Sequence, residues 1–209
     1  MQTATKKIVT IDELSVKAKE YRDSGKKVVL CHGIFDLIHA GHIRYLKSAL
    51  SEGDVLFVTI TADEFVNKGP GRPVFSQELR AENLGHLNFV DYVAVNQAPT
   101  AVNVISELKP HAYAKGNDYK NLDDDITGNI HLEKQAVEEG GGKIIMRNMG
   151  DTKIAISRKS DFHCTIRAGT FILELETEKF SLTRQRERFL ISFFRFITLK
   201  YGEIIGVTF

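Results

Sequence analysis

Cysteine is scarce in this 209-residue chain, which contains only Cys31 and Cys164. The two thiols lie far apart and form no CxxC pair, so we expect reduced cysteines of a cytoplasmic protein, with a disulfide as the alternative. No apolar run approaches the roughly 18 residues that a membrane helix needs. Residues 1–27 contain no apolar segment before a small-residue cleavage site, so the sequence predicts no secretion signal.

An excess of charge of one sign is also absent. Lysine and arginine number 28 and aspartate and glutamate 27, which gives a formal net charge of +1. This balance provides no general attraction to nucleic acid or to an anionic membrane, so neither partner is expected. A charged ligand must therefore be held by local groups. Hydrophobic residues make up 43% of the chain, enough for one well-filled core and a small appendage.

Short apolar runs alternate with helical patterns over residues 1–150. Thr10 and Glu13 have the spacing of a capping box and predict a helix that ends at Gly25. Further on, the predicted strands are 27–31, 54–61, 90–95, 112–114 and 143–146, and the predicted helices are 38–50, 77–87, 101–108 and 131–139. This alternation predicts βαβ units and an α/β, Rossmann-like fold with a parallel sheet and helices on both faces.

The pattern changes after residue 150, which divides the chain into an α/β domain, 1–150, and a C-terminal extension, 151–209. Alternating runs in the extension, clearest at 170–175, predict antiparallel strands. The last 30 residues are rich in phenylalanine and arginine. Such a segment is typical of a helix or hairpin packed on the domain or at a dimer interface, with RNA or membrane contact as the alternative.

The segment GIFDLIHAGH, residues 33–42, joins the first predicted strand to the next helix. Ligands of open parallel sheets bind beyond the carboxyl ends of the strands. Gly33 lets the backbone turn closely under a ligand, Gly41 leaves room for a phosphate, and the helix N-terminus offers N–H groups to an anion. His39 and His42 stand at i and i+3, on one side of the first turn. Two imidazoles converging on an anion suit phosphoryl or nucleotidyl transfer, in which positioned donors stabilise charge on phosphate oxygens.

Two other interpretations of the histidine pair stay open. One is zinc binding, which needs a third and usually a fourth protein ligand. Cys31 and His32 are near in sequence, but Cys31 is expected to be buried in the strand. The other is a purely structural role, such as capping the helix. No metal-ligand set is predicted.

Three blocks of sequence, in order, carry a resemblance to a known family. GIFDLIHAGH is similar to the GxFDxxHxGH signature of cytidylyltransferase-like nucleotidyltransferases. KGPGRPVFSQELRAENLGHLNFVDYVAV (68–95) and LKPHAYAKGNDY (108–119) resemble the adenylyltransferase domains of ADP-heptose synthases. The resemblance runs from about residue 26 to residue 146. It implies an enzyme of carbohydrate metabolism that transfers AMP from ATP to a sugar 1-phosphate, with heptose 1-phosphate favoured, and releases pyrophosphate. The product would be an ADP-sugar, a lipopolysaccharide precursor.

The resemblance also implies roles for individual residues. His39, His42 and Lys68 would be catalytic, the histidines holding the triphosphate and stabilising the reacting α-phosphate. Residues that would bind the nucleotide are Gly33, Ile34, Phe35, Asp36, His39, Gly41, His42, Lys115, Gly116, Asp118 and Ser157. Residues that would contact the sugar phosphate are Asp36, Asp63, Lys68, Arg72 and Asp118. Mg²⁺ is expected with ATP, held largely by phosphates and water.

Several of these positions keep a second interpretation. Asp36 would either fix the turn or reach the substrate, and Asp63 would either bind substrate hydroxyls or cap the next helix. The glycine-rich loop that carries Lys68 and Arg72 is suited to clamping phosphates, but a solvated surface loop has the same composition.

One family motif has no clean copy. A serine- and threonine-rich motif, (I/F)S(S/T)(T/S)xI, is expected after the last strand, and AISRKS (155–160, with Ser157) and KFSLTRQ (179–185) match it only partly. This gap leaves open a catalytically impaired nucleotide-binding module. The shared signature leaves open a cytidylyltransferase acting on glycerol 3-phosphate or a similar polyol phosphate. A homodimer and a separate sugar kinase as pathway partner are also expected.

Overall fold

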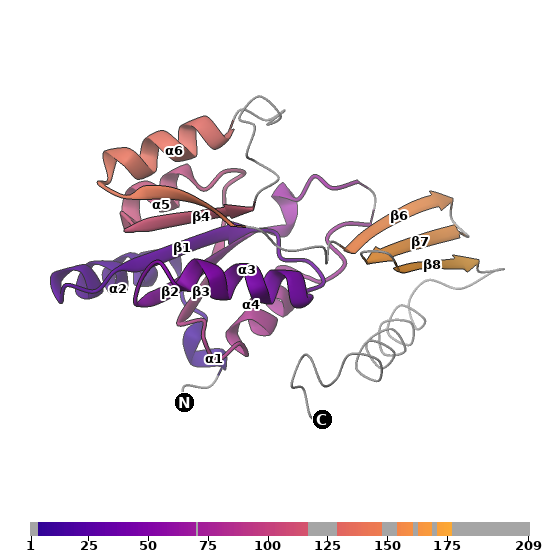
Figure 1. The fold of residues 1–209 in the computed structure, drawn as a ribbon, viewed down its shortest axis with the longest axis horizontal. Helices are drawn as coiled ribbons and strands as arrows, with labels where there is room; N and C mark the ends of the chain where they lie inside the picture. Colours follow the sequence, from indigo (N-terminus) through magenta and orange to yellow (C-terminus); the bar gives the residue numbers. More distant parts are fainter. Residues whose placement is uncertain are drawn as a thin grey trace. The chain divides into compact units, whose positions relative to one another are not determined.

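The computed structural model describes residues 4–69, 71–116 and 129–147 with their side chains, and the backbone of residues 154–160, 163–168 and 171–176. The chain divides into two compact units, Met1–Gly150 and Asp151–Phe209. The first unit contains a five-stranded sheet, and the second unit contains a three-stranded sheet (Figure 1). Each unit is described by itself below.

The first unit alternates strands and helices as the sequence predicts. Its strands are β1 (Val28–Gly33), β2 (Val55–Thr61), β3 (Tyr92–Asn96), β4 (Ala112–Gly116) and β5 (Lys143–Arg147). Its helices are α1 (Ala4–Lys7), α2 (Ile11–Asp23), α3 (Ala40–Leu50), the 3-10 helix η1 (Asp63–Phe65), α4 (Gln77–Gly85), α5 (Val102–Leu108) and α6 (Asn129–Glu139). Every element predicted for this unit is present, which confirms the Rossmann-like α/β fold.

Two boundaries differ from the prediction where they affect the site. β1 extends two residues further, to Gly33, because its pairing with β2 continues to that residue. The predicted helix start at Ile38 is wrong. α3 begins at Ala40, since the backbone of His39 is extended, with φ −136° and ψ 174°. His39 is therefore the N-cap of α3 rather than a residue of its first turn.

All five strands are parallel, in the order β3-β2-β1-β4-β5. The chain moves outward from β1 to β3 and then returns to place β4 on the other side of β1. The strand order therefore reverses between β1 and β4. In an open parallel sheet the ligand crevice lies at this reversal, beyond the carboxyl ends of the strands.

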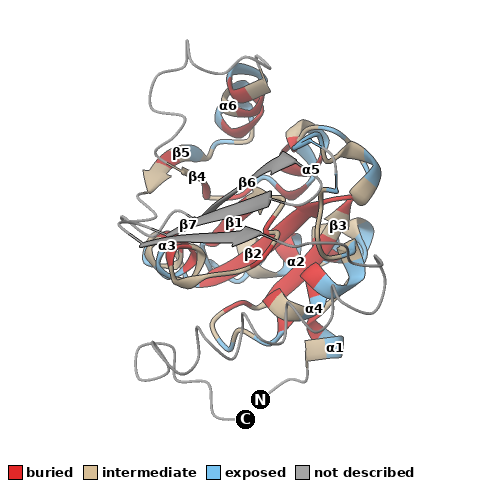
Figure 2. Ribbon diagram, turned by 90° about the vertical axis from the view of Figure 1, so that its right-hand side faces the viewer, coloured by how far each residue is buried: buried red, intermediate tan, exposed pale blue. Residues whose placement is uncertain are grey.

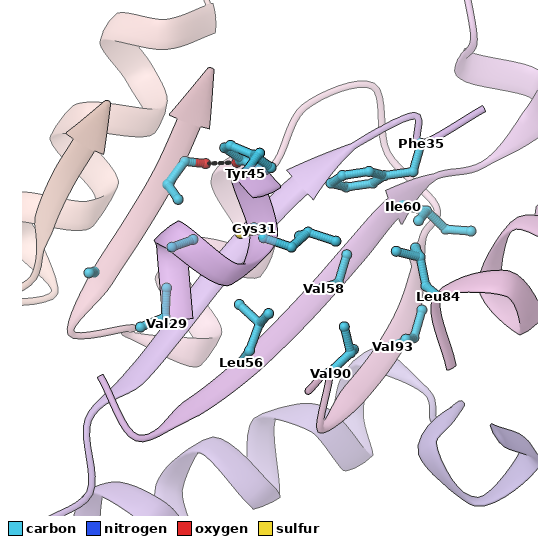
Figure 3. Packing of buried hydrophobic residues seen from close by; sticks show 14 of the residues in the cluster. Val29, Cys31, Phe35, Tyr45, Leu56, Val58, Ile60, Leu84, Val90 and Val93 are labelled. Atoms are coloured by element: carbon cyan, nitrogen blue, oxygen red, sulfur yellow. Dashed lines mark hydrogen bonds between the residues drawn. The ribbon is translucent and has the colours of Figure 1, made fainter. Parts of the chain in front are cut away.

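Helices cover both faces of the sheet, and β1 to β4 are mostly buried, whereas the edge strand β5 is partly exposed (Figure 2). On one face α3 and α4 pack on residues such as Val29, Leu56 and Val58 (Figure 3). On the other face α2, α5 and α6 pack on residues such as Leu30 and Phe57. Continuous apolar strands of this kind are typical of a parallel sheet covered on both sides.

The second unit holds β6 (Ile154–Ser160), β7 (His163–Ala168) and β8 (Phe171–Glu176) in that order. Both pairs are antiparallel, which confirms the strand type predicted after residue 150. The aromatic and basic segment 180–209 lies outside the described residues. Over the described part of the chain, no helix combines the length and apolarity needed to cross a membrane.

Candidate active site

The turn that follows β1 has a strained backbone. Phe35 and Leu37 adopt positive φ angles, 50° and 51°. This left-handed conformation costs a residue with a side chain about 1–2 kcal/mol. Both side chains are buried, and their packing offsets this cost. Figure 3 shows the Phe35 ring beyond the end of β1, near Ile60. A Cβ on Gly33 would lie 3.3 Å from that ring, so a larger residue at this position would press on Phe35.

His39 and His42 lie together at the N-terminus of α3. Their ring centroids are 4.0 Å apart, and His42 also packs edge-on against Phe35 at 5.6 Å. His39 Nδ1 accepts a hydrogen bond from the Gly41 amide at 3.1 Å, and His42 Nδ1 accepts one from the His39 amide at 3.4 Å. The two imidazoles therefore cap the helix reciprocally, as serine and glutamate do in a capping box.

This capping fixes the position of the protons on both rings. A neutral imidazole whose Nδ1 accepts a hydrogen bond carries its proton on Nε2. His39 and His42 therefore each keep one Nε2–H that the cap does not use. The structural role that the sequence analysis left open and a donor role toward a ligand are compatible, because they use different nitrogens.

Both rings are neutral at pH 7. Burial lowers the pKa of His39 to about 4. Burial, together with the neighbouring His39, lowers the pKa of His42 to about 3, against the opposing effect of Asp36. The pair is thus suited to donating hydrogen bonds and unsuited to carrying positive charge.

Asp36 holds the following loop to the turn. Its carboxylate accepts hydrogen bonds from the Arg72 guanidinium at 2.9 Å and from the amides of Val74 and Phe75 at 2.8 and 3.1 Å. The side chain of Asp36 is 8% exposed. These contacts correspond to the turn-fixing alternative, and they attach the loop that carries Lys68.

Asp63 is held by α4. Its carboxylate accepts from the Gln77 amide at 3.1 Å and from Arg80 at 2.6 Å. These contacts correspond to the capping alternative for Asp63. Arg80 is a residue that the sequence analysis missed. Its signal is its position four residues before the buried Leu84, which puts a cation on the apolar face of α4.

Lys115, at the end of β4, pairs with Glu133 of α6. The Lys115 Nζ lies 2.7 Å from a Glu133 carboxylate oxygen, and the side chains are 12% and 4% exposed. Tyr113 donates its hydroxyl to Glu133 at 3.0 Å, and the Ala101 amide donates at 3.3 Å. The predicted phosphate-binding lysine is therefore held by a buried carboxylate.

His32, at the end of β1, lies between two threonines of β2. Its Nδ1 is 2.9 Å from the Thr59 hydroxyl and its Nε2 is 3.3 Å from the Thr61 hydroxyl. Burial, and secondarily the charge of Lys115, lower the pKa of His32 to about 3. A neutral ring thus stands at the point where the strand order reverses.

The remaining predicted site residues have fewer described contacts. Lys68 is exposed, on a loop in which Gly69 and Gly71 adopt φ angles of 92° and 74° that favour glycine. Gly116 ends β4 beside Lys115. Asp118 and the side chain of Ser157 lie outside what the structure describes.

The described residues offer no group of three or more histidine, cysteine, aspartate or glutamate side chains placed to hold a metal ion. Cys31 is buried, and burial raises the pKa of its thiol to about 12, against the opposing effect of Tyr45. A thiol with this pKa is a poor metal ligand and a poor nucleophile at neutral pH. Neutral donors at a helix N-terminus, beyond the end of a parallel strand, suit a phosphorylated ligand.

Comparison with known proteins agrees with this geometry. The family model described as cytidylyltransferase-like matches residues 30–188, more than half of the chain. The chain belongs to the cytidylyltransferase-like family of nucleotidyltransferases. The expected enzyme class is thereby confirmed.

Curated relatives of this family member carry the name bifunctional protein HldE. The protein from Aliarcobacter butzleri is 39% identical over 132 residues, which cover 61% of this chain and 28% of the relative. The protein from Pelobacter propionicus is 36% identical over 149 residues, which cover 70% and 29%. This chain thus spans under a third of their length.

Among solved structures, the lipopolysaccharide core biosynthesis protein of Thermoplasma volcanium is similar, with 24% identity and a TM-score of 0.48. The match covers 59% of this chain and 96% of that one.

Proposed function

We propose that this protein transfers AMP from ATP to a sugar 1-phosphate and releases pyrophosphate. The observation that carries the proposal is the pair of neutral imidazoles of His39 and His42, each capping α3 through Nδ1 and keeping an Nε2–H for a ligand. They stand beyond the end of β1, at the reversal of strand order where α/β sheets bind nucleotides.

The reaction needs positioned donors more than an acid or a base. A phosphate oxygen of the sugar 1-phosphate attacks the α-phosphorus of ATP, one P–O bond forms, and the bond to the β-phosphate oxygen breaks. The attacking phosphate is already anionic, so no proton has to be removed from it. The Nε2–H groups of His39 and His42 donate hydrogen bonds that stabilise the negative charge on the α-phosphate oxygens.

Cations around this point would neutralise the rest of the triphosphate. Lys115 reaches the same sheet edge from β4, and Lys68 lies on the loop that Asp36 attaches to the turn. Mg²⁺ enters with ATP as the Mg–ATP substrate, because the described residues provide no carboxylate cluster for it.

Adenine and heptose are the choices that rest on sequence resemblance. Residues 68–95 and 108–119 resemble the adenylyltransferase domains of ADP-heptose synthases, and the curated relatives support this branch of the family. A sugar kinase must then supply the substrate. The bifunctional relatives are in keeping with such a partner. A separate kinase, a homodimer and a cytoplasmic location stay predictions.

The test is a screen of four nucleoside triphosphates, each with Mg²⁺, against phosphorylated sugars and polyols, with pyrophosphate release as the readout. We expect the fastest release with ATP and heptose 1-phosphate. Turnover with CTP and glycerol 3-phosphate would instead assign the chain to the cytidylyltransferases. Calorimetry is run in parallel. Tight ATP binding without pyrophosphate release from any pair would contradict enzyme activity and favour a nucleotide-binding module.

A further inference from the structure

Arg80 is the most completely buried charged side chain of the described residues, with 0% relative exposure. Burying a guanidinium is unfavourable unless its donors are satisfied. Among the described residues, its ion pair is with Asp63, which is itself 40% exposed. The ion pair with Asp63 therefore does not by itself account for the burial of Arg80.

The guanidinium of Arg80 joins three chain segments at the carboxyl edge of the sheet: the turn after β1, the end of β2 with η1, and the loop before α4. Its Nη1 donates to the Ile34 carbonyl at 2.5 Å, and its Nη2 donates to the Thr61 carbonyl at 2.7 Å and to Asp63 at 2.6 Å. Its Nε donates to the Phe75 carbonyl at 3.1 Å. These carbonyls lie at or beyond strand ends and in loops, where a fork of donors can reach several of them at once.

The contacts of Arg80 close a ring around the turn after β1. Ile34, whose carbonyl Arg80 binds, directly precedes the strained residue Phe35. Asp36, on the other side of Phe35, accepts from the amide of Phe75, and the carbonyl of Phe75 accepts from Arg80. The turn is thus held on both sides of Phe35 from a single guanidinium and a single loop.

A turn held in this way controls the histidines. Left-handed residues at 35 and 37 persist only where the surroundings over-determine them. The turn leads directly into His39, the N-cap, and the Phe35 ring supports His42. We propose that Arg80 is a positioning residue of the active site, which holds the turn after β1 and so fixes the orientation and tautomer of His39 and His42.

The experiment has a spectroscopic arm and a kinetic arm, and only the kinetic arm rests on the proposed nucleotidyl transfer. The variant is Arg80→Lys, which keeps the charge and loses the fork. Nitrogen-15 spectra of the imidazole rings report tautomers without substrate. We expect fixed Nε2–H forms for His39 and His42 in the wild type, and nitrogen shifts averaged between tautomers in the variant.

The kinetic arm separates positioning from binding. Displacing reacting groups by about 1 Å costs on the order of 100-fold in rate. We expect kcat for pyrophosphate release to fall about 100-fold in Arg80→Lys, with KM for ATP within about threefold of the wild type. Wild-type kcat together with fixed tautomers in Arg80→Lys would overturn the proposal. Fixed tautomers in a wild type that releases no pyrophosphate would instead count against the proposed function alone.

Two further variants complete the design. Arg22→Lys is the matched control, because Arg22 also donates to a backbone carbonyl, that of Leu108, but at the opposite edge of the sheet. It should leave tautomers and kcat unchanged. Asp63→Asn is a milder change for use if Arg80→Lys does not fold, since it removes the charge from only one of the four contacts and so weakens that contact. We expect partial tautomer averaging and a several-fold lower kcat. A rise in KM for the sugar phosphate with fixed tautomers would overturn the proposal in favour of substrate binding by Asp63.

Discussion

The two sides of the strand-order reversal use charge in opposite ways. On the β1 side, the charged side chains hold the turn and the loop together, namely those of Asp36, Arg72 and Arg80. The groups that face a ligand there are the neutral rings of His39 and His42. On the β4 side, the cation is Lys115, which forms an ion pair with the buried carboxylate of Glu133. Fixed neutral donors suit the atoms that react, whereas an exchangeable cation suits a triphosphate that arrives and leaves.

The comparison predicts its largest effect at the histidines. Removing one positioned donor to a reacting phosphate costs about 10²–10³ in kcat. His39→Ala and His42→Ala should each lose activity on that scale in a pyrophosphate assay. His86→Ala is the control, since His86 is an exposed histidine at the end of α4. A loss below tenfold in both site variants would show that the neutral pair is not what stabilises the reaction.

On the β4 side we expect two smaller effects on KM for ATP, in opposite directions. Lys115→Met should raise KM for ATP about tenfold, because it removes a cation near the phosphates. Glu133→Gln should lower KM for ATP several-fold, because the triphosphate no longer competes with a carboxylate for Lys115. It should also lower the free energy of unfolding, by about 3 kcal/mol, because a buried pair is broken.

Lys143→Met provides the matched control for Lys115. Lys143 also pairs with a glutamate, Glu52, but at the start of β5 and in a more exposed position. The KM of Lys143→Met for ATP should equal that of the wild type. If Glu133→Gln raised KM as Lys115→Met does, Glu133 would be an anchor for the lysine and not a competitor of the phosphate.

The smallest effect concerns pH. The pKa of His39 is about 4 and that of His42 about 3 in the folded protein, against about 6.5 in an unfolded chain. Between these values the unfolded state binds more protons, so stability rises with pH and is lost as pH falls below about 6.5. Each histidine contributes a slope of about 1 kcal/mol per pH unit, reduced by its partial exposure.

Urea unfolding at pH 5, 6 and 7 measures this slope. The free energy of unfolding of His42→Gln should change less steeply with pH than that of the wild type. Equal slopes would mean that His42 is not held neutral by burial. Because both rings are neutral well below pH 7, neither histidine should contribute an acid limb to kcat/KM near pH 6.5.

Local spacing carried much of the prediction. The capping box of Thr10 and Glu13 is present as expected. The proximity of His39 and His42 followed from their i, i+3 separation at a helix start. The strand and helix order needed only apolar runs and turn residues. Boundaries were less accurate, because pairing with β2 extended β1 and the cap shortened α3.

Long-range pairing was not predictable in the same way. Glu133 has the sequence context of an exposed helical residue, yet it lies beneath Lys115 and Tyr113. Asp36 and Arg72 are 36 residues apart and meet only because the loop folds back over the turn. Each of these contacts depends on the order of the strands, which no single segment encodes.

The sequence by itself determined the α/β class, the succession of its elements and the pairing of two histidines, because these follow from residue spacing along one strand or one helix. Only the tertiary structure decided which nitrogen of each histidine caps α3, that Arg80 binds the turn, and that Lys115 rests on Glu133. The contacts of Arg80 and Lys115 join segments far apart in the chain, so they form only once the sheet has been assembled. The histidine caps are local, but they depend on ring orientations that residue spacing alone does not specify.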